Sequence, residues 1–156
     1  MATWTEFEAA APGLADTARR LLDAHTHKTL ASLRRDGSPR ISGTETAFAD
    51  ADLWIGSMWQ ARKAHDLQRD PRFALHSGSD DPPEWKGDAK LAGVAEEITD
   101  PERVKQINGD KAPPGPSHLF RLDLREVSVV RLHESGRALV IEVWTPDGGV
   151  RTIERS

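Results

Sequence analysis

The segment that decides the fold is SMWQARKAHDLQRDPRFAL, residues 57–75. A short apolar strand ends at its first residue, and the polar residues that follow predict a helix from Gln60 to Arg69. Pro71 ends this helix, because a proline disfavours helical backbone at the residue before it. Arg62 and Lys63 therefore lie side by side in the first turn of a helix that directly follows a buried strand.

These two cations lie at the helix end where a cation is least favourable. The first turn of a helix carries unpaired backbone N–H groups and a partial positive charge, so added cations slightly lower the stability of the helix. An anion reverses that balance, because it accepts hydrogen bonds from the free N–H groups and pairs with both side chains. Arg62 and Lys63 thus favour a phosphate-binding site over the alternative, a solvated helix start.

The rest of the chain is mainly β. A short amphipathic helix is expected over residues 15–24, and a second one after Asp100, which is a good helix cap. Regular alternation of strands and helices is missing, so the pattern predicts an antiparallel barrel of six or seven strands with short flanking helices (α+β) rather than a doubly wound sheet. Strands are expected at residues 29–33, 40–48, 53–57, 72–76, 89–98, 119–124 with its continuation at 127–132, and 137–144.

Composition limits the classes of function. The chain has 156 residues, 37% of them hydrophobic, and we expect one domain with a helical segment at 1–26 and a barrel at 27–156. Cysteine is absent, which excludes disulfides, thiolate metal sites and a cysteine nucleophile. A formal net charge of -4 argues against nucleic-acid binding. We find neither a membrane-spanning apolar stretch nor a signal-peptide pattern, so we expect a cytoplasmic protein that does not bind membranes.

The segment over residues 57–75 resembles the phosphate-binding segment of the pyridoxamine 5'-phosphate oxidase-like, FMN-binding split barrels. It does so in the run Arg62-Lys63-Ala64-His65, in the strand before that run and in Asp70-Pro71-Arg72 after it. The resemblance extends from about Lys28 to Arg155. It implies an antiparallel split β-barrel, a homodimer, and a flavin bound between the two subunits. Arg62 and Lys63 would hold the phosphate of FMN.

The resemblance also implies contacts for the rest of the cofactor. Ser57 and Met58, at the end of the third strand, would lie along the isoalloxazine ring. Arg40, at the start of the second strand, would contact the phosphate or the ribityl chain. Trp144 and Arg155, near the C-terminus, would face the cofactor of the partner subunit. Without the resemblance, Trp144 is read as a core aromatic and Arg155 as an exposed terminal charge.

Two positions differ from the substrate site of the true oxidase in this family. Thr46 stands near the place of a lysine, and Ile153 stands at the place of a histidine. The chain is therefore more similar to the compact members of the family, which use FMN or the deazaflavin F-420 as a hydride carrier. A deazaflavin has a long acidic tail that needs further cations. The lysines available for that tail are Lys86, Lys90, Lys105 and Lys111.

The leading hypothesis is a flavin-type oxidoreductase that transfers hydride to a small molecule, with the chemistry supplied by the cofactor. No side chain is assigned a catalytic role. No metal site is expected, because His25 and His27 lack the spacing of a helical metal-binding pair. The alternative is a non-catalytic protein on the same fold that binds or sequesters a flavin or a haem. The histidines that could ligate a haem are His76, His118 and His133.

Overall fold

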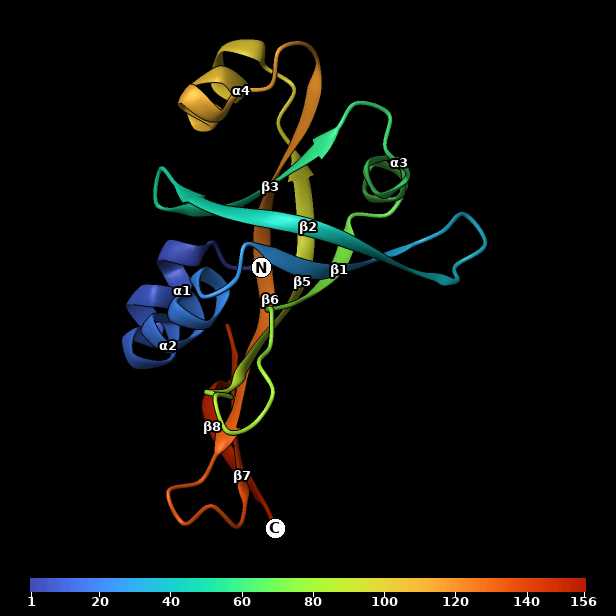
Figure 1. Cartoon of the computed structure of the whole chain (residues 1–156). Coiled ribbons are helices and arrows are strands. Elements are labelled where there is room, and N and C mark those ends of the chain that lie inside the picture. The colour runs from blue at the N-terminus through green and yellow to red at the C-terminus, as the bar shows by residue number, and fades with distance from the viewer.

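The computed structural model describes residues 1–156 as a β-barrel with four α-helices and a two-stranded extension (Figure 1). The helices are α1 (Trp4–Ala10), α2 (Pro12–Asp23), α3 (Arg62–Arg69) and α4 (Pro101–Asn108), and the 3-10 turn η1 (Gly109–Lys111) follows α4. The strands are β1 (His27–Leu33), β2 (Pro39–Ala49), β3 (Asp52–Met58), β4 (Arg72–His76), β5 (Asp88–Glu97), β6 (Ser117–Leu132), β7 (Leu139–Thr145) and β8 (Gly149–Arg155).

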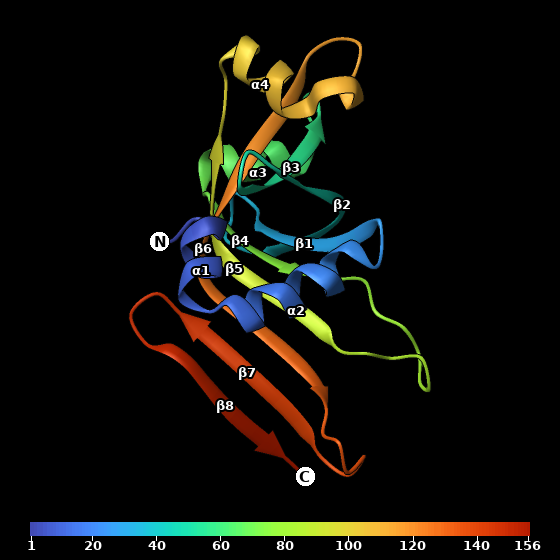
Figure 2. The ribbon, with the colours of Figure 1, turned by 90° about the vertical axis from the view of Figure 1, so that its left-hand side faces the viewer.

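Six strands close the barrel. They run in the order β3-β2-β1-β4-β5-β6 with antiparallel pairings, and β3 also pairs with β6, which joins the two edges of the sheet. The closing pair places Gly56 opposite Leu119 and Ser57 opposite His118. β7 and β8 continue the sheet beyond β6 and extend from the barrel at the end opposite to α4 (Figures 1 and 2).

Alternate strand residues fill the barrel, because successive side chains of a strand point to opposite faces. In β1, Leu30 and Ser32 are buried, whereas the neighbouring Thr29 and Ala31 are more exposed. α1 and α2 cover one side of the barrel (Figure 2) and contribute apolar side chains such as Trp4 to the same core. None of the helices has the length and apolar character needed to span a membrane.

The fold class expected from the sequence is confirmed as mainly β, an antiparallel barrel with flanking helices. Two further elements extend it. Within the helical segment expected at 1–26 only one helix is predicted, over residues 15–24, yet α1 precedes it, and Thr3 and Glu6 form a capping box at its start. β8 is not expected either, because the side chains of that strand are mostly exposed on both faces and leave no apolar pattern.

Helix α3 also begins two residues later than expected. Gln60 has a φ of +61°, which lies outside the helical region, and the helix starts at Arg62. The two residues predicted to bind a phosphate, Arg62 and Lys63, are therefore the first two residues of the helix.

Candidate cofactor-binding site

The turn between β3 and α3 sets the direction of the helix start. The backbone N–H of Gln60 donates to Nε2 of His118 at 3.1 Å, which fixes the turn against β6. Ala61 is the N-cap residue, with extended backbone, and no side chain caps the helix. The N–H groups of the first turn, at Arg62 and Lys63, are therefore available to an external acceptor.

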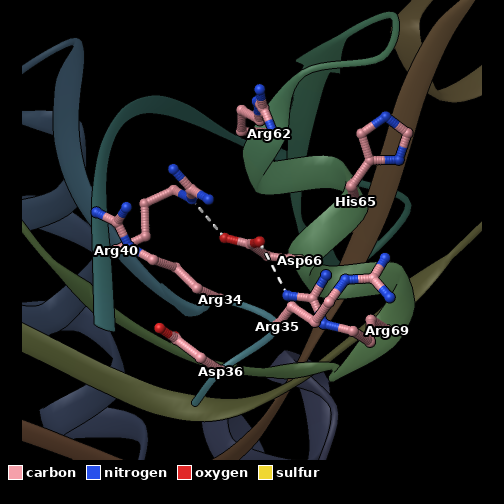
Figure 3. Close-up of a pocket in the computed structure, with 8 residues that line it drawn as sticks. All are labelled: Arg34, Arg35, Asp36, Arg40, Arg62, His65, Asp66 and Arg69. Atoms are coloured by element: carbon pink, nitrogen blue, oxygen red, sulfur yellow. Dashed lines mark hydrogen bonds and ion pairs between the residues drawn. The ribbon is translucent and has the colours of Figure 1, made fainter. Parts of the chain in front are cut away.

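A cavity of about 510 Å³ lies between α3 and the turn that joins β1 to β2 (Figure 3). Five arginines and two carboxylates line it, and no hydrophobic side chain does. We call it the arginine cavity, and its lining residues are Arg34, Arg35, Asp36, Arg40, Arg62, His65, Asp66 and Arg69. Its excess of guanidinium groups suits an anion with several oxygen atoms, because each guanidinium presents several N–H donors in one plane.

Asp66 is the buried anchor of the arginine cavity, only 3% exposed. Its Oδ2 accepts hydrogen bonds from Arg40 Nε at 2.6 Å and from Ser32 Oγ at 2.9 Å, and its Oδ1 accepts one from Arg69 at 3.0 Å. Burial alone raises the pKa of this carboxyl, but the hydrogen bonds from Arg40, Ser32 and Arg69 outweigh burial and hold the pKa below its usual value. Asp66 is therefore ionised at neutral pH and orients the guanidinium groups of Arg40 and Arg69.

The adjacent cations Arg62 and Lys63 point in different directions. Arg62 is exposed and lines the arginine cavity, whereas Lys63 turns toward β2, where its Nζ donates to the carbonyl oxygen of Gly43 at 2.9 Å. Burial lowers the pKa of Lys63, and the carboxylate of Glu45 partly offsets this effect. Of the predicted pair, only Arg62 faces the cavity, and Lys63 must release Gly43 to contact the same anion.

Ser57 and Met58 end β3 next to this turn. Ser57 is buried and its Oγ donates to the carbonyl oxygen of Met58 at 3.3 Å, whereas the side chain of Met58 is 83% exposed. A ring lying along this strand end would therefore meet the side chain of Met58 rather than the hydroxyl of Ser57. The contact of both residues with a flavin stays a prediction.

Trp144 and Arg155 lie on the two-stranded extension and do not line the arginine cavity. Trp144, on β7, is buried against Phe7 of α1, with 4.7 Å between the ring centroids. Arg155 is the last residue of β8 and is exposed. The structure places Trp144 in the core of its own subunit, and a contact of either residue with the partner's cofactor stays a prediction.

Four functional candidates were missed in the sequence. Arg34 and Arg35 lie between the strands expected at 29–33 and 40–48, in a segment that was given no function, and Asp66 and Arg69 lie on α3. A signal was present, because an acid on the apolar face of a helix needs partners, and Arg69 follows Asp66 at the helical spacing of three. None of the lysines considered for an acidic tail lines the cavity.

The family model described as Pyridoxamine 5'-phosphate oxidase matches residues 14–131, from α2 through most of β6. The chain belongs to this family. The resemblance carried by Arg62 and Lys63 is thereby confirmed at the level of the family. No protein with a curated functional description matches the sequence.

Solved structures similar to this member of the pyridoxamine 5'-phosphate oxidase family show the same fold. A pyridoxamine 5'-phosphate oxidase-related, FMN-binding protein from Nostoc punctiforme is 15% identical, with 96% of each chain covered and a TM-score of 0.62. A protein from Clostridium acetobutylicum related to general stress protein 26 is 12% identical, with 86% of this chain and 94% of that chain covered and a TM-score of 0.66. A heme-binding protein from Mycobacterium smegmatis is 17% identical, with 93% and 88% covered and a TM-score of 0.63.

Proposed function

We propose that the protein is a flavin-type oxidoreductase that binds the phosphate of FMN in the arginine cavity and exchanges hydride with a small molecule. The observation that carries this proposal is the cavity itself, which gathers five arginines along one face of α3, from its uncapped start at Arg62 to its last residue, Arg69. Arg40 and Arg69 pair with Asp66, whereas Arg34, Arg35 and Arg62 form no ion pair, so their charges repel one another until an anion binds among them. Membership of the family supports the choice of a flavin as that anion.

The residues present fit the phosphate end of such a cofactor. Arg62 would contact the phosphate directly, together with the N–H groups of the first turn of α3. Arg40 would contact it in the orientation that Asp66 imposes. The ring would lie along the end of β3, at Met58. When bound, a flavin supplies the hydride chemistry, and this chain binds and orients it.

A deazaflavin is the second candidate cofactor. Arg34 and Arg35 add two cations to the cavity that Arg62 lines, which gives it more cations than one phosphate requires. A long acidic tail would use these extra donors, because each carboxylate accepts two hydrogen bonds from one guanidinium.

We also propose that the protein works as a homodimer. Four small or apolar residues are direct cross-strand neighbours on the outer face of the barrel, in the order Ile41, Ala31, Ala74 and Ala92. Ile41 is 75% exposed. A row of small side chains allows another backbone to approach closely, and a patch of this kind is typical of a surface that a partner covers.

The test of the proposed function is a titration of purified protein with FMN and with a deazaflavin, for the wild type and for the double variant R62A/K63A. A charged hydrogen bond contributes about 1.5–3 kcal/mol, so the double variant should lose at least about tenfold in affinity. The control is R19A/R20A, which removes an adjacent pair of exposed cations from α2. Equal affinity of R62A/K63A and the control contradicts the cofactor site.

Turnover is tested on the same samples. Loss of the flavin absorbance after addition of a reduced nicotinamide supports the oxidoreductase. A protein that binds the flavin but never loses this absorbance is the non-catalytic binding protein of the alternative. If the protein shows a Soret band after addition of haem and does not bind a flavin, its cofactor is haem and the flavin is removed from the proposal.

A further inference from the structure

A second cavity, of about 720 Å³, adjoins the β3–α3 turn and shares no lining residue with the arginine cavity. It lies between that turn, the start of β6 and helix α4, and we call it the α4 groove. Ile98 and Val104 give it apolar walls, together with prolines of the segment that leads from α4 to β6. Its volume is that of a site for a small organic molecule.

The base of the α4 groove is a rigid network of hydrogen bonds. His118 is buried and accepts the N–H of Gln60 at Nε2, so the proton of its neutral ring is on Nδ1, which lies 2.6 Å from Oε1 of Glu97. Oε2 of Glu97 accepts a second hydrogen bond, from Gln68 at 2.8 Å. Because these groups already satisfy one another, the network supports the groove and offers little polar recognition to a ligand.

The indole ring of Trp59 stacks on this hydrogen-bond network. Its ring stacks on the ring of His118, with 4.7 Å between the centroids and 10° between the planes, yet the residue remains 54% exposed and lines the groove. One face of the indole is covered by His118, and the other is available for stacking. A side chain that is already fixed loses little conformational entropy when a ligand stacks on it.

The charges of the groove limit what it can bind. Besides His118, its titratable side chains are Glu97, whose two oxygens are both occupied, and Lys105 on α4. We infer that the α4 groove binds a planar aromatic molecule with at most one negative charge, which stacks on Trp59 and places any acid group near Lys105. Its role as the molecule that reacts with the cofactor rests on the proposed function, whereas the binding itself does not.

The test measures binding of 2-naphthoate, a planar aromatic monoanion, by calorimetry, with its saturated counterpart decahydro-2-naphthoate as the matched non-aromatic probe. We expect the wild type to bind 2-naphthoate at least about tenfold more tightly than the saturated probe, since stacking is lost with the aromatic ring. The variant W59A should lose about tenfold in affinity for 2-naphthoate, and W59F should recover part of it. The control is W85A, because Trp85 lies outside the groove.

Lys105 is tested with a neutral probe. The variant K105Q should bind 2-naphthoate and the uncharged 2-naphthol with similar affinity, whereas the wild type should prefer 2-naphthoate. The inference is overturned if W59A binds 2-naphthoate as tightly as the wild type does, or if the wild type binds the saturated probe equally well. It is also overturned if W59A shifts from dimer to monomer, because Trp59 would then belong to a subunit interface. Competition between saturating FMN and 2-naphthoate also overturns it, because the groove would then hold the ring of the cofactor.

The outcomes separate this inference from the proposed function. Binding of 2-naphthoate without binding of FMN or a deazaflavin retains the groove and rejects the cofactor site. Binding of a flavin with no effect of W59A on 2-naphthoate retains the cofactor site and rejects the groove. The double variant R62A/K63A should bind 2-naphthoate like the wild type, because neither residue lines the groove.

Discussion

The carboxylate of Asp66, on α3, accepts a 2.6 Å hydrogen bond from Nε of Arg40, on β2. Ser32, which is the cross-strand neighbour of Arg40 on β1, donates to the same oxygen. One buried acid in the middle of α3 therefore joins this helix to the first hairpin of the barrel. It also leaves the remaining donors of the Arg40 guanidinium for the arginine cavity, which Arg40 lines.

Replacement of Asp66 by Asn should lower the stability of the fold. The variant leaves Arg40 and Arg69 without their charged partner in a mostly buried place, and we expect a loss of about 2–4 kcal/mol at pH 7. Urea denaturation measures the free energy of unfolding. The control is D16N, whose partner Arg20 lies on the surface of α2, and it should change stability little.

The effect of D66N should also depend on pH. The pKa of Asp66 is held below its usual value in the folded protein, so its contribution is fully present above the pKa of the unfolded chain and is lost as pH falls through the folded pKa. The wild type should therefore lose stability relative to D66N on acidification below about pH 4. A constant difference between the two proteins from pH 7 to pH 3 contradicts this assignment.

Gly93 marks the one irregularity in the pairing of β5 with β6. Ala92 pairs with Glu126 and Gly93 with Leu124, so Arg125 is an extra residue of β6, and a Cβ on Gly93 would overlap the backbone of Asp123. We expect G93A to cost more than about 2 kcal/mol in thermal or urea unfolding, because backbone must move. G43A is the matched strand variant, with no atom within 4 Å of the new Cβ, and it should not destabilise.

The sequence predicts the local parts of this fold because local residues cause them. The strands expected at 29–33 and 40–48 are consecutive in the chain and pair as the first hairpin, and the pair Arg62 and Lys63 is enough to indicate an anion site. The family resemblance added the expected barrel type. These features depend on residues that are neighbours in the chain.

The sequence does not predict which distant residues meet. Asp66 acquires its partners from Ser32 and Arg40, more than 20 residues away, only after β1 and β2 have paired in one register. Closure of the barrel likewise brings His118 to Gln60. This contact fixes the turn between β3 and α3, and the helix begins at Arg62 rather than at Gln60. Periodicity carries no information on such contacts, so the cavity and the groove become visible only in the structure.

The extra arginines should decide between the two candidate cofactors. If the acidic tail of a deazaflavin contacts Arg34 and Arg35, the double variant R34A/R35A should weaken deazaflavin binding by about tenfold and FMN binding by much less. The weakening should also shrink as salt is added, because the contacts are exposed. Equilibrium titration at two salt concentrations measures both effects. An equal loss for the two cofactors assigns these arginines to the shared phosphate instead.

The outer face of the barrel gives the last prediction, which concerns the homodimer. Ile41 lies at one end of the row that continues through Ala31, Ala74 and Ala92, and it is exposed in the isolated chain. In a two-fold symmetric dimer the same patch is used twice, so I41E would place two carboxylates in the interface and remove two buried isoleucines. Each isoleucine contributes about 1.5–3 kcal/mol, so dimer affinity should fall at least about a hundredfold.

Sedimentation over a range of protein concentrations measures this change, with L132E as the matched variant, because Leu132 is also exposed but lies at the end of β6, outside the row. The wild type and L132E should be dimers and I41E a monomer of unchanged fold. If the flavin lies between subunits, I41E should also bind FMN more weakly although Ile41 does not line the arginine cavity. A monomeric I41E with full affinity for FMN would show that one subunit holds the cofactor alone, and a monomeric wild type would remove the dimer from the proposal.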